Sequence, residues 1–187
     1  MKKRRSNRIP EFDYSTSGSY FITICTYKMN CIFGEINNEK MILDDCGKIA
    51  EKYWLEIPMH FPRAEMDSFI VMPNHIHGII NIIDDVGARH VEPGNKQNKH
   101  VGARHVEPGI NKYQRIIPGS IGSIIRSYKS AVTKWIHKNT TINNVWQRNY
   151  YEYIIQNDNE LYRIQEYIYY NPLNWQIEKI ERHNIFG

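Results

Sequence analysis

The sequence has little that would mark a secreted, disulfide-bonded or membrane protein. Only three cysteines occur in 187 residues, and Cys25, Cys31 and Cys46 show neither an even count nor CxxC spacing. We therefore expect reduced thiols in a cytoplasmic protein. No apolar run is long enough to cross a membrane, because residues 69–83 are interrupted by proline, asparagine and two histidines. The basic N-terminus has no apolar segment behind it, so we do not expect a secretory signal.

The composition is that of a globular protein with one domain, residues 1–187. Hydrophobic residues make up 41% and charged residues 24% of the chain. The net charge of +4 permits a nucleic-acid partner without requiring one. Thirteen tyrosines and four tryptophans supply rings that suit stacking on unpaired bases, although most such rings belong to a core.

Two histidines interrupt an otherwise apolar stretch, residues 68–83, which is rich in β-favouring side chains. Because side chains alternate between the faces of a strand, His75 and His77 project from one face, with Cα atoms about 6.6 Å apart, and Ile76 from the other. Pro73 cannot donate to a strand ladder, so we expect a break, a bulge or an edge position there. The two imidazoles can hold a metal ion, and the alternative is a buried pair without a ligand.

Patterns on either side of this stretch predict further strands and helices. The predicted strands are 19–27, 31–36 and 40–43, and a short strand or helix is expected within 146–155. Three helices are predicted. The first is capped by Asp44 or Asp45 and ended by Pro58 and Pro62, the second runs from Ser120 to about Lys138, and the third is capped by Asn157 or Asp158 and ended by Pro172.

The last predicted helix carries two residues that can complete a metal site. Tyr167 and Asn171 are four residues apart and therefore lie together on the helix. His75, His77 and Asn171 form a mixed set of nitrogen and oxygen donors, which suits Mg²⁺ or Mn²⁺ better than structural zinc. A metal there would orient a phosphodiester for attack by Tyr167, giving a covalent phosphotyrosine. The phenol would need the metal or a proton acceptor to become a good nucleophile.

Basic residues in three places are candidate contacts to DNA phosphates. Arg126 and Lys129 share the polar face of the helix from Ser120, where a merely solvated face is the alternative. Arg148 lies in the loop that follows. The third place is a basic arm, residues 1–16, where a disordered tail is the alternative; its candidates are Lys2, Lys3, Arg4, Arg5 and Arg8.

Residues 84–118 differ in kind from the rest of the chain. The nine residues 86–94 recur identically at 101–109, and the segment is polar and punctuated by glycine and proline. We interpret it as a flexible inserted loop, because two copies cannot build a repeat fold and little apolar surface is available to order them. His90, His100 and His105 could form a metal-binding tract, but the duplication explains their recurrence.

Four stretches resemble the single-tyrosine transposases with an HUH signature (histidine, bulky hydrophobic residue, histidine), and most of all the REP-associated tyrosine transposases. They are residues 72–78 (MPNHIHG), residues 8–14 leading to 20–25, residues 146–151 (WQRNYY) and residues 167–172 (YIYYNP). The resemblance implies a ferredoxin-like α+β fold, an antiparallel sheet with helices packed on one face. It also implies cleavage of single-stranded, hairpin-bearing DNA through a 5′-phosphotyrosine, with Mg²⁺ or Mn²⁺, in a homodimer.

Carried over residue by residue, the resemblance makes His75, His77 and Asn171 the metal ligands and Tyr167 the nucleophile. Two positions depart from the family pattern: relatives often carry histidine where this chain has Tyr153, and a basic residue where it has Gln156. The departures favour a weakened or non-catalytic copy. In all, three other hypotheses stay open. They are a nickase of the replication-initiator or relaxase type, a non-catalytic hairpin-binding protein derived from a transposase, and an α+β domain whose histidines are simply buried.

Overall fold

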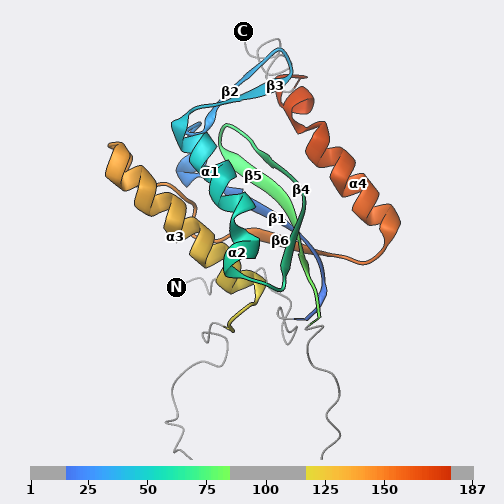
Figure 1. Ribbon diagram of the computed structural model, residues 1–187. Coiled ribbons are helices and arrows are strands. Elements are labelled where there is room, and N and C mark those ends of the chain that lie inside the picture. Colours follow the sequence, from blue (N-terminus) through green and yellow to red (C-terminus); the bar gives the residue numbers. More distant parts are fainter. Residues whose placement is uncertain (1–15, 85–116, 178–187) are drawn as a thin grey trace, which may run out of the picture.

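The computed structural model describes residues 16–84 and 117–177. Its centre is a four-stranded antiparallel sheet in the order β4-β5-β1-β6 (Figure 1). The strands are β1 (Gly18–Cys25), β4 (Ala64–Val71), β5 (His75–Ile82) and β6 (Tyr151–Ile155). This is the strand order of a ferredoxin-like fold, and the predicted α+β class is confirmed. A separate hairpin is formed by β2 (Gly34–Asn37) and β3 (Lys40–Leu43).

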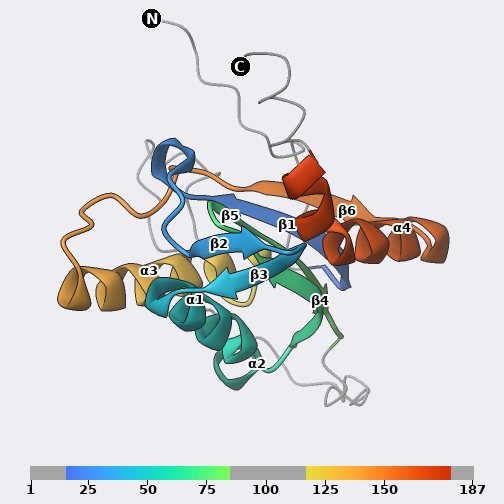
Figure 2. The same cartoon turned by 90° about the horizontal axis from the view of Figure 1, so that it is seen from above.

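Helices cover the two faces of the sheet unequally (Figures 1 and 2). One face is covered by α1 (Asp45–Leu55) and α3 (Ile121–Asn139), with the short α2 (Ile57–His60) after α1 and a 3₁₀ turn at Tyr27–Met29 after β1. The last helix, α4 (Asp158–Tyr169), lies on the opposite side and packs along β4. The expectation that all helices pack on one face is therefore wrong for α4, which covers the face of His77. The side chains of Asp44, Ser120 and Asn157 cap α1, α3 and α4 by accepting a hydrogen bond from a backbone N–H, as their sequence positions predicted.

The core lies between the sheet and the α1–α3 layer. Tyr128 on α3 packs edge-to-face against Trp54 on α1 and donates a hydrogen bond to the carbonyl of Ala50. Trp54 is fully buried against the sheet, where Gly78 leaves room for its indole. The apolar positions of β1, β5 and α3 fill the remaining volume: Tyr20, Ile22, Ile24, Ile76, Ile80, Ile82, Ile121, Ile124, Ile125, Val132 and Ile136. The α1–α3 layer therefore packs against the face of β5 that carries Ile76.

Two helix ends differ from the prediction. Pro58 does not end a helix but lies in the first turn of α2, where its missing N–H costs nothing. Pro172 does not end one either: α4 stops at Tyr169, and residues 171–177 are helical again, with Pro172 in their first turn. The extended segment is interrupted at residues 72–74, between β4 and β5, as the position of Pro73 predicted.

Some predictions concern parts of the chain outside the described residues. These are the basic arm up to residue 15, with Lys2, Lys3, Arg4, Arg5 and Arg8, and the duplicated segment with His90, His100 and His105. Among the described residues, no helix is both long enough and apolar enough to cross a bilayer.

Candidate functional site

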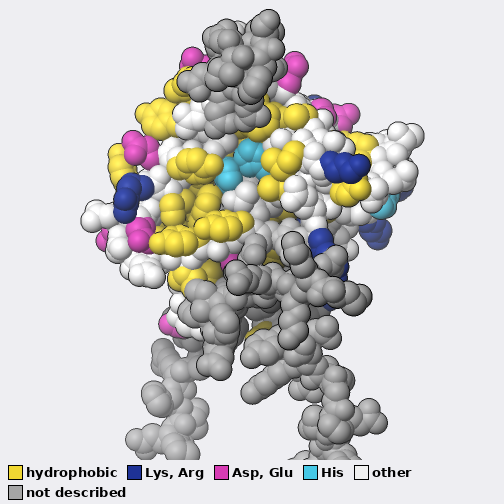
Figure 3. All heavy atoms as spheres, turned by 180° about the vertical axis from the view of Figure 1, so that it is seen from behind, with side chains coloured by type: hydrophobic (Ala, Val, Ile, Leu, Met, Phe, Trp, Pro, Cys, Tyr) yellow, Lys and Arg dark blue, Asp and Glu magenta, His cyan; other side chains and the backbone are white. Residues whose placement is uncertain are grey.

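The site begins with two histidines on the sheet face opposite α1 and α3. His75 and His77 lie on β5 and are only 8% and 6% exposed, with ring centroids 4.5 Å apart. Their neighbour Ile76 points into the core on the other side. In Figure 3, histidine side chains are visible at the centre of the molecule with hydrophobic side chains on either side. The alternation along β5 thus holds both imidazoles on one face, as the sequence predicted.

The ring of His75 is oriented by the preceding residue. Asn74 donates from Nδ2 to the carbonyl of Met29 (3.1 Å), which fixes its amide so that Oδ1 lies 2.7 Å from Nδ1 of His75. Because Oδ1 can only accept, Nδ1 of His75 donates the hydrogen. Nε2 is then the nitrogen that carries the lone pair, which is the form that a metal ligand requires.

The ring of His77 is oriented from the neighbouring strand. Thr23 lies directly opposite His77 in the β1–β5 ladder, and its Oγ1 is 2.8 Å from Nδ1 of His77. Phe21, two residues earlier on β1, stacks on the same imidazole with ring centroids 5.3 Å apart. This side-chain partner at Nδ1 turns Nε2 toward α4, where it meets a tyrosine.

That tyrosine is Tyr167, whose hydroxyl lies 3.2 Å from Nε2 of His77. The helix is fastened across the sheet by Gln165, which donates to the carboxylate of Asp67 on β4 (2.9 Å). Tyr167 is 46% exposed as a residue, although its hydroxyl contacts a buried ring. A nucleophile at this position can meet a phosphate that lies over the histidines.

Asn171 lies between two residues that contact the histidines. Tyr167, one turn earlier, contacts His77, and Trp175, one turn later, packs against His75 with ring centroids 5.8 Å apart. Asn171 itself is 6% exposed. The main chain here is held by the β2–β3 turn, where the N–H of Glu39 donates to the side chain of Gln176 (2.8 Å). Asn171 is therefore a buried residue, one turn away from each of the two residues that contact the imidazoles.

Burial sets the charge state of His77. The pKa of His77 is lowered to about 3, first by desolvation and then by the neighbouring His75. At neutral pH this imidazole is uncharged, as a metal ligand must be. In the described ranges no three His, Cys, Asp or Glu side chains come together as a metal site. Asn171 is the third ligand that the sequence suggests, and two imidazole nitrogens with one amide oxygen form a donor set that suits Mg²⁺ or Mn²⁺.

The three predicted cations within the described residues differ in their surroundings. Arg126 on α3 and Arg148 in the loop before β6 are exposed. Lys129 is half-buried, and its Nζ donates to the carbonyls of Gln147 (2.6 Å) and Asn149 (3.3 Å). Burial lowers the pKa of Lys129 to about 8. Lys129 thus fastens the loop to α3, and a contact from it to a phosphate would have to share an ammonium that already donates two hydrogen bonds.

Sequence reasoning missed four residues around the histidines. Thr23 and Phe21 contact His77 only because β1 and β5 pair in one register, and no local signal announces a partner 54 residues away. Trp175 lies beyond the proline where the helix was predicted to end. Asn74 carried a signal, since it directly precedes the histidine pair.

The comparisons with known proteins agree with this fold. A solved structure of a REP-associated tyrosine transposase bound to a REP hairpin aligns with a TM-score of 0.55, over 93% of this chain and 74% of that chain, at 17% identity. At that identity the comparison establishes the fold, which is that of a REP-associated tyrosine transposase.

Sequence comparison assigns the family. The chain is 41% identical over 177 residues to an uncharacterized protein of Haemophilus influenzae, an alignment that covers 95% of this chain and 92% of that protein. The chain therefore belongs to the same family as the H. influenzae protein. No protein-family model matches it.

Proposed function

We propose that this protein is a transposase that cleaves and rejoins single-stranded, hairpin-bearing DNA through a 5′-phosphotyrosine at Tyr167. The observation that carries the proposal is the contact between the Tyr167 hydroxyl and His77 Nε2, because the proposed reaction needs a phenol next to one of the metal ligands. The DNA substrate is supported by the fold, which a transposase bound to a REP hairpin shares.

The chemical step is a transesterification at one phosphorus. Oη of Tyr167 forms a bond to the phosphorus while the bond to the 3′ oxygen breaks. The phenolic proton passes to solvent, and the 3′ oxygen leaves as a hydroxyl. The number of phosphoester bonds is unchanged, so attack by a 3′ hydroxyl on the phosphotyrosine rejoins the strands without an external energy source.

Three residues would hold the ion. His75 and His77 would bind through Nε2, since Asn74 and Thr23 are the partners of the two Nδ1 atoms, and Asn171 through its amide oxygen. Mg²⁺ or Mn²⁺ bound there would neutralise phosphate charge and so make the phosphorus more open to attack. Phe21 and Trp175 pack beside the rings and limit the positions that the two imidazoles can take.

The proposal includes a homodimer, as in the proteins that the sequence resembles. Tyr167 and His77 nevertheless make their contact within one chain, so a second copy is not needed to bring them together. Sedimentation of the full chain with and without hairpin DNA tests the homodimer separately. A single species with the mass of one chain in both conditions would refute the homodimer.

A non-catalytic hairpin-binding protein is the second candidate, and Tyr153 is the observation that favours it. This residue stands where relatives often carry histidine, and it lies on β6 directly opposite Phe21, on the sheet face of His77. If a histidine at that position assists the reaction, its replacement weakens or removes cleavage while leaving DNA binding in place.

One assay separates the two candidates. The full chain is incubated with an end-labelled DNA hairpin that carries unpaired flanks, with Mn²⁺ or with a chelator. The transposase proposal predicts a labelled protein–DNA adduct that survives denaturation and forms only with the divalent ion. A chain that binds the hairpin but forms neither adduct nor shorter DNA would establish the binding protein instead.

A further inference from the structure

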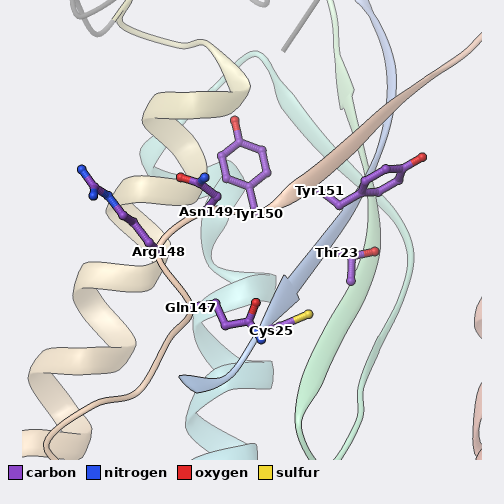
Figure 4. A pocket seen from close by; sticks show the side chains of 7 residues that line it. All are labelled: Thr23, Cys25, Gln147, Arg148, Asn149, Tyr150 and Tyr151. Atoms are coloured by element: carbon purple, nitrogen blue, oxygen red, sulfur yellow. The ribbon is translucent and has the colours of Figure 1, made fainter. Parts of the chain in front are cut away.

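A pocket adjoins the histidine site on the β6 side of the sheet. Its volume is about 390 Å³, and it is lined by the ends of β1 and β6 and by the loop between α3 and β6 (Figure 4). Thr23 belongs to both places, since it lines the pocket and its hydroxyl is hydrogen-bonded to His77. The pocket therefore opens directly beside the proposed site of phosphate attack.

One row of side chains runs across the sheet from the pocket to the histidines. Tyr151 on β6 lies opposite Thr23 on β1, and Thr23 lies opposite His77 on β5. Neighbouring strands are about 4.8 Å apart, so Tyr151 and His77 are separated by roughly 10 Å across the sheet. A DNA strand with one phosphate over the histidines thus brings an adjacent nucleotide over Tyr151.

The chemistry of the lining suits a nucleotide. Tyr151 is 51% exposed and offers an aromatic surface next to Thr23, while Arg148 extends in the opposite direction in Figure 4. Arg148 is the charged residue among the lining residues, which include no carboxylate. Gln147 and Asn149 add amides, which both donate and accept hydrogen bonds. An aromatic ring, a cation and amides match a base, a phosphate and the edge of the base, respectively.

The pocket wall is held in place before any ligand arrives. The N–H of Gln147 donates to the carbonyl of Cys25 (2.9 Å), which joins the loop to the end of β1. Lys129 binds the carbonyls on both sides of Arg148, and the indole of Trp146 donates to the carbonyl of Lys129 (3.1 Å). Little loop ordering would be needed on binding, which favours affinity.

We infer that this pocket binds one unpaired nucleotide of the DNA strand next to the scissile phosphate. Its base stacks on Tyr151, and Arg148, which extends away from that ring, contacts a further phosphate of the same strand. The inference rests on the proposed function, because it takes the substrate from it and adds a binding site that the histidine–tyrosine centre does not include.

The test is a binding experiment that does not depend on cleavage. The full chain with Tyr167→Phe is titrated, without divalent ions, against a labelled DNA hairpin with unpaired thymidine flanks. Tyr151→Ala should weaken binding by about 5- to 100-fold, as expected for loss of one stacked base, whereas Tyr151→Phe should stay within about twofold. Tyr162→Ala removes a ring from α4 that is more exposed still (65%) and is the control.

Abasic sites locate the nucleotide. Removing the base at one position of the flank should weaken binding to the protein that retains Tyr151. The same abasic DNA should bind Tyr151→Ala as well as the intact DNA does, because the base and the ring belong to one contact that is already lost. Arg148→Ala should reduce the salt dependence of binding by about one phosphate contact. Lys138→Ala, at the end of α3, is its control.

The outcomes separate this inference from the proposed function. If the unsubstituted chain forms the Tyr167 adduct but Tyr151→Ala binds the hairpin as well as Tyr162→Ala, the nucleotide pocket is wrong and the transposase proposal stands. The pocket is also wrong if no single abasic position couples to Tyr151. If the chain binds no hairpin at all, both are wrong.

Discussion

The hydroxyl of Tyr167 lies 3.2 Å from Nε2 of His77, although ninety residues separate the two in sequence. The strand supplies a rigid imidazole whose other nitrogen is bound by Thr23, and the helix supplies the phenol. This contact joins two halves of a site that lie on different elements. Its consequences for cleavage, metal binding, stability and pH dependence can each be tested.

Tyr167→Phe removes only the oxygen that would attack the phosphorus. We expect it to abolish the covalent protein–DNA adduct while hairpin affinity changes by about twofold or less, because one hydroxyl contributes little to binding. Denaturing electrophoresis of the labelled hairpin measures the adduct. Tyr162→Phe, on the same helix, should retain it. An adduct that persists in Tyr167→Phe would move the nucleophile to another tyrosine, with Tyr150 and Tyr151 as the first candidates.

His75→Ala removes one of three proposed metal ligands. Loss of a partner that only orients a ligand typically lowers metal affinity by roughly 10- to 100-fold, and we expect the loss of a ligand itself to lower Mn²⁺ affinity by more than that. The protein–DNA adduct should disappear, as we expect it to do with a chelator. Isothermal titration of the purified chain with Mn²⁺ measures the first effect. Asn171→Ala tests the amide ligand in the same way. His60→Ala, an exposed histidine on α2, is the control, and equal Mn²⁺ affinity in all four proteins would refute the metal site.

Thr23→Val keeps the shape of the side chain at position 23 but removes the hydroxyl at Nδ1 of His77. The ring then loses the partner that fixes its orientation, so Mn²⁺ affinity should fall by about 10-fold or more. Thr23→Ser retains a hydroxyl and should restore most of the affinity. The comparison uses the same titration. Equal affinities for the valine and serine variants would mean that Phe21 and the strand alone orient the imidazole.

Much of the fold followed from local signals in the sequence. The alternation around Ile76 placed both histidines on one face, and the residues Asp44, Ser120 and Asn157 marked the starts of three helices. These predictions succeeded because strand alternation and N-capping depend on side chains within a few positions.

The surroundings of the site could not be predicted, because they depend on packing between distant segments. Thr23 meets His77 through strand register, and the helix reaches the imidazoles through a bond from Gln165 to Asp67. Lys129 was predicted to contact DNA because it shares a helix face with Arg126, but the loop after α3 folds back over its ammonium. The departure at Pro172 has a local cause, since proline is tolerated in the first turn of a new helical segment.

Gly78→Ala should destabilise the protein from the core side of β5. A Cβ at this position would overlap the indole of Trp54 and lie 3.0 Å from Cβ of Phe69, and Trp54 is fully buried. Such overpacking costs about 1–3 kcal/mol of the free energy of unfolding. Urea titration followed by tryptophan fluorescence measures the loss. Ser130→Ala, at an exposed position on α3, should stay within about 0.5 kcal/mol of the unsubstituted chain. An unchanged midpoint for Gly78→Ala would mean that the indole can shift at no cost.

Lys129 should make stability depend on pH in a particular window. Its pKa is lowered from 10.5 to about 8 in the folded chain because burial disfavours the ammonium. Between these two values the unfolded chain binds more protons at this position, so the contribution of Lys129 to the free energy of unfolding rises with pH. Lys129→Met lacks this contribution but keeps an aliphatic chain against Trp146. The unsubstituted chain should therefore gain stability relative to Lys129→Met as pH rises from about 8 toward 10.5, measured by urea unfolding at several pH values.

Tyrosine titration is common to both proteins and cancels in the difference. Lys138→Met, on an exposed part of the same helix, controls for the loss of one charge. A difference that stays constant across the window would mean that the two carbonyl hydrogen bonds hold Lys129 charged as firmly as water does.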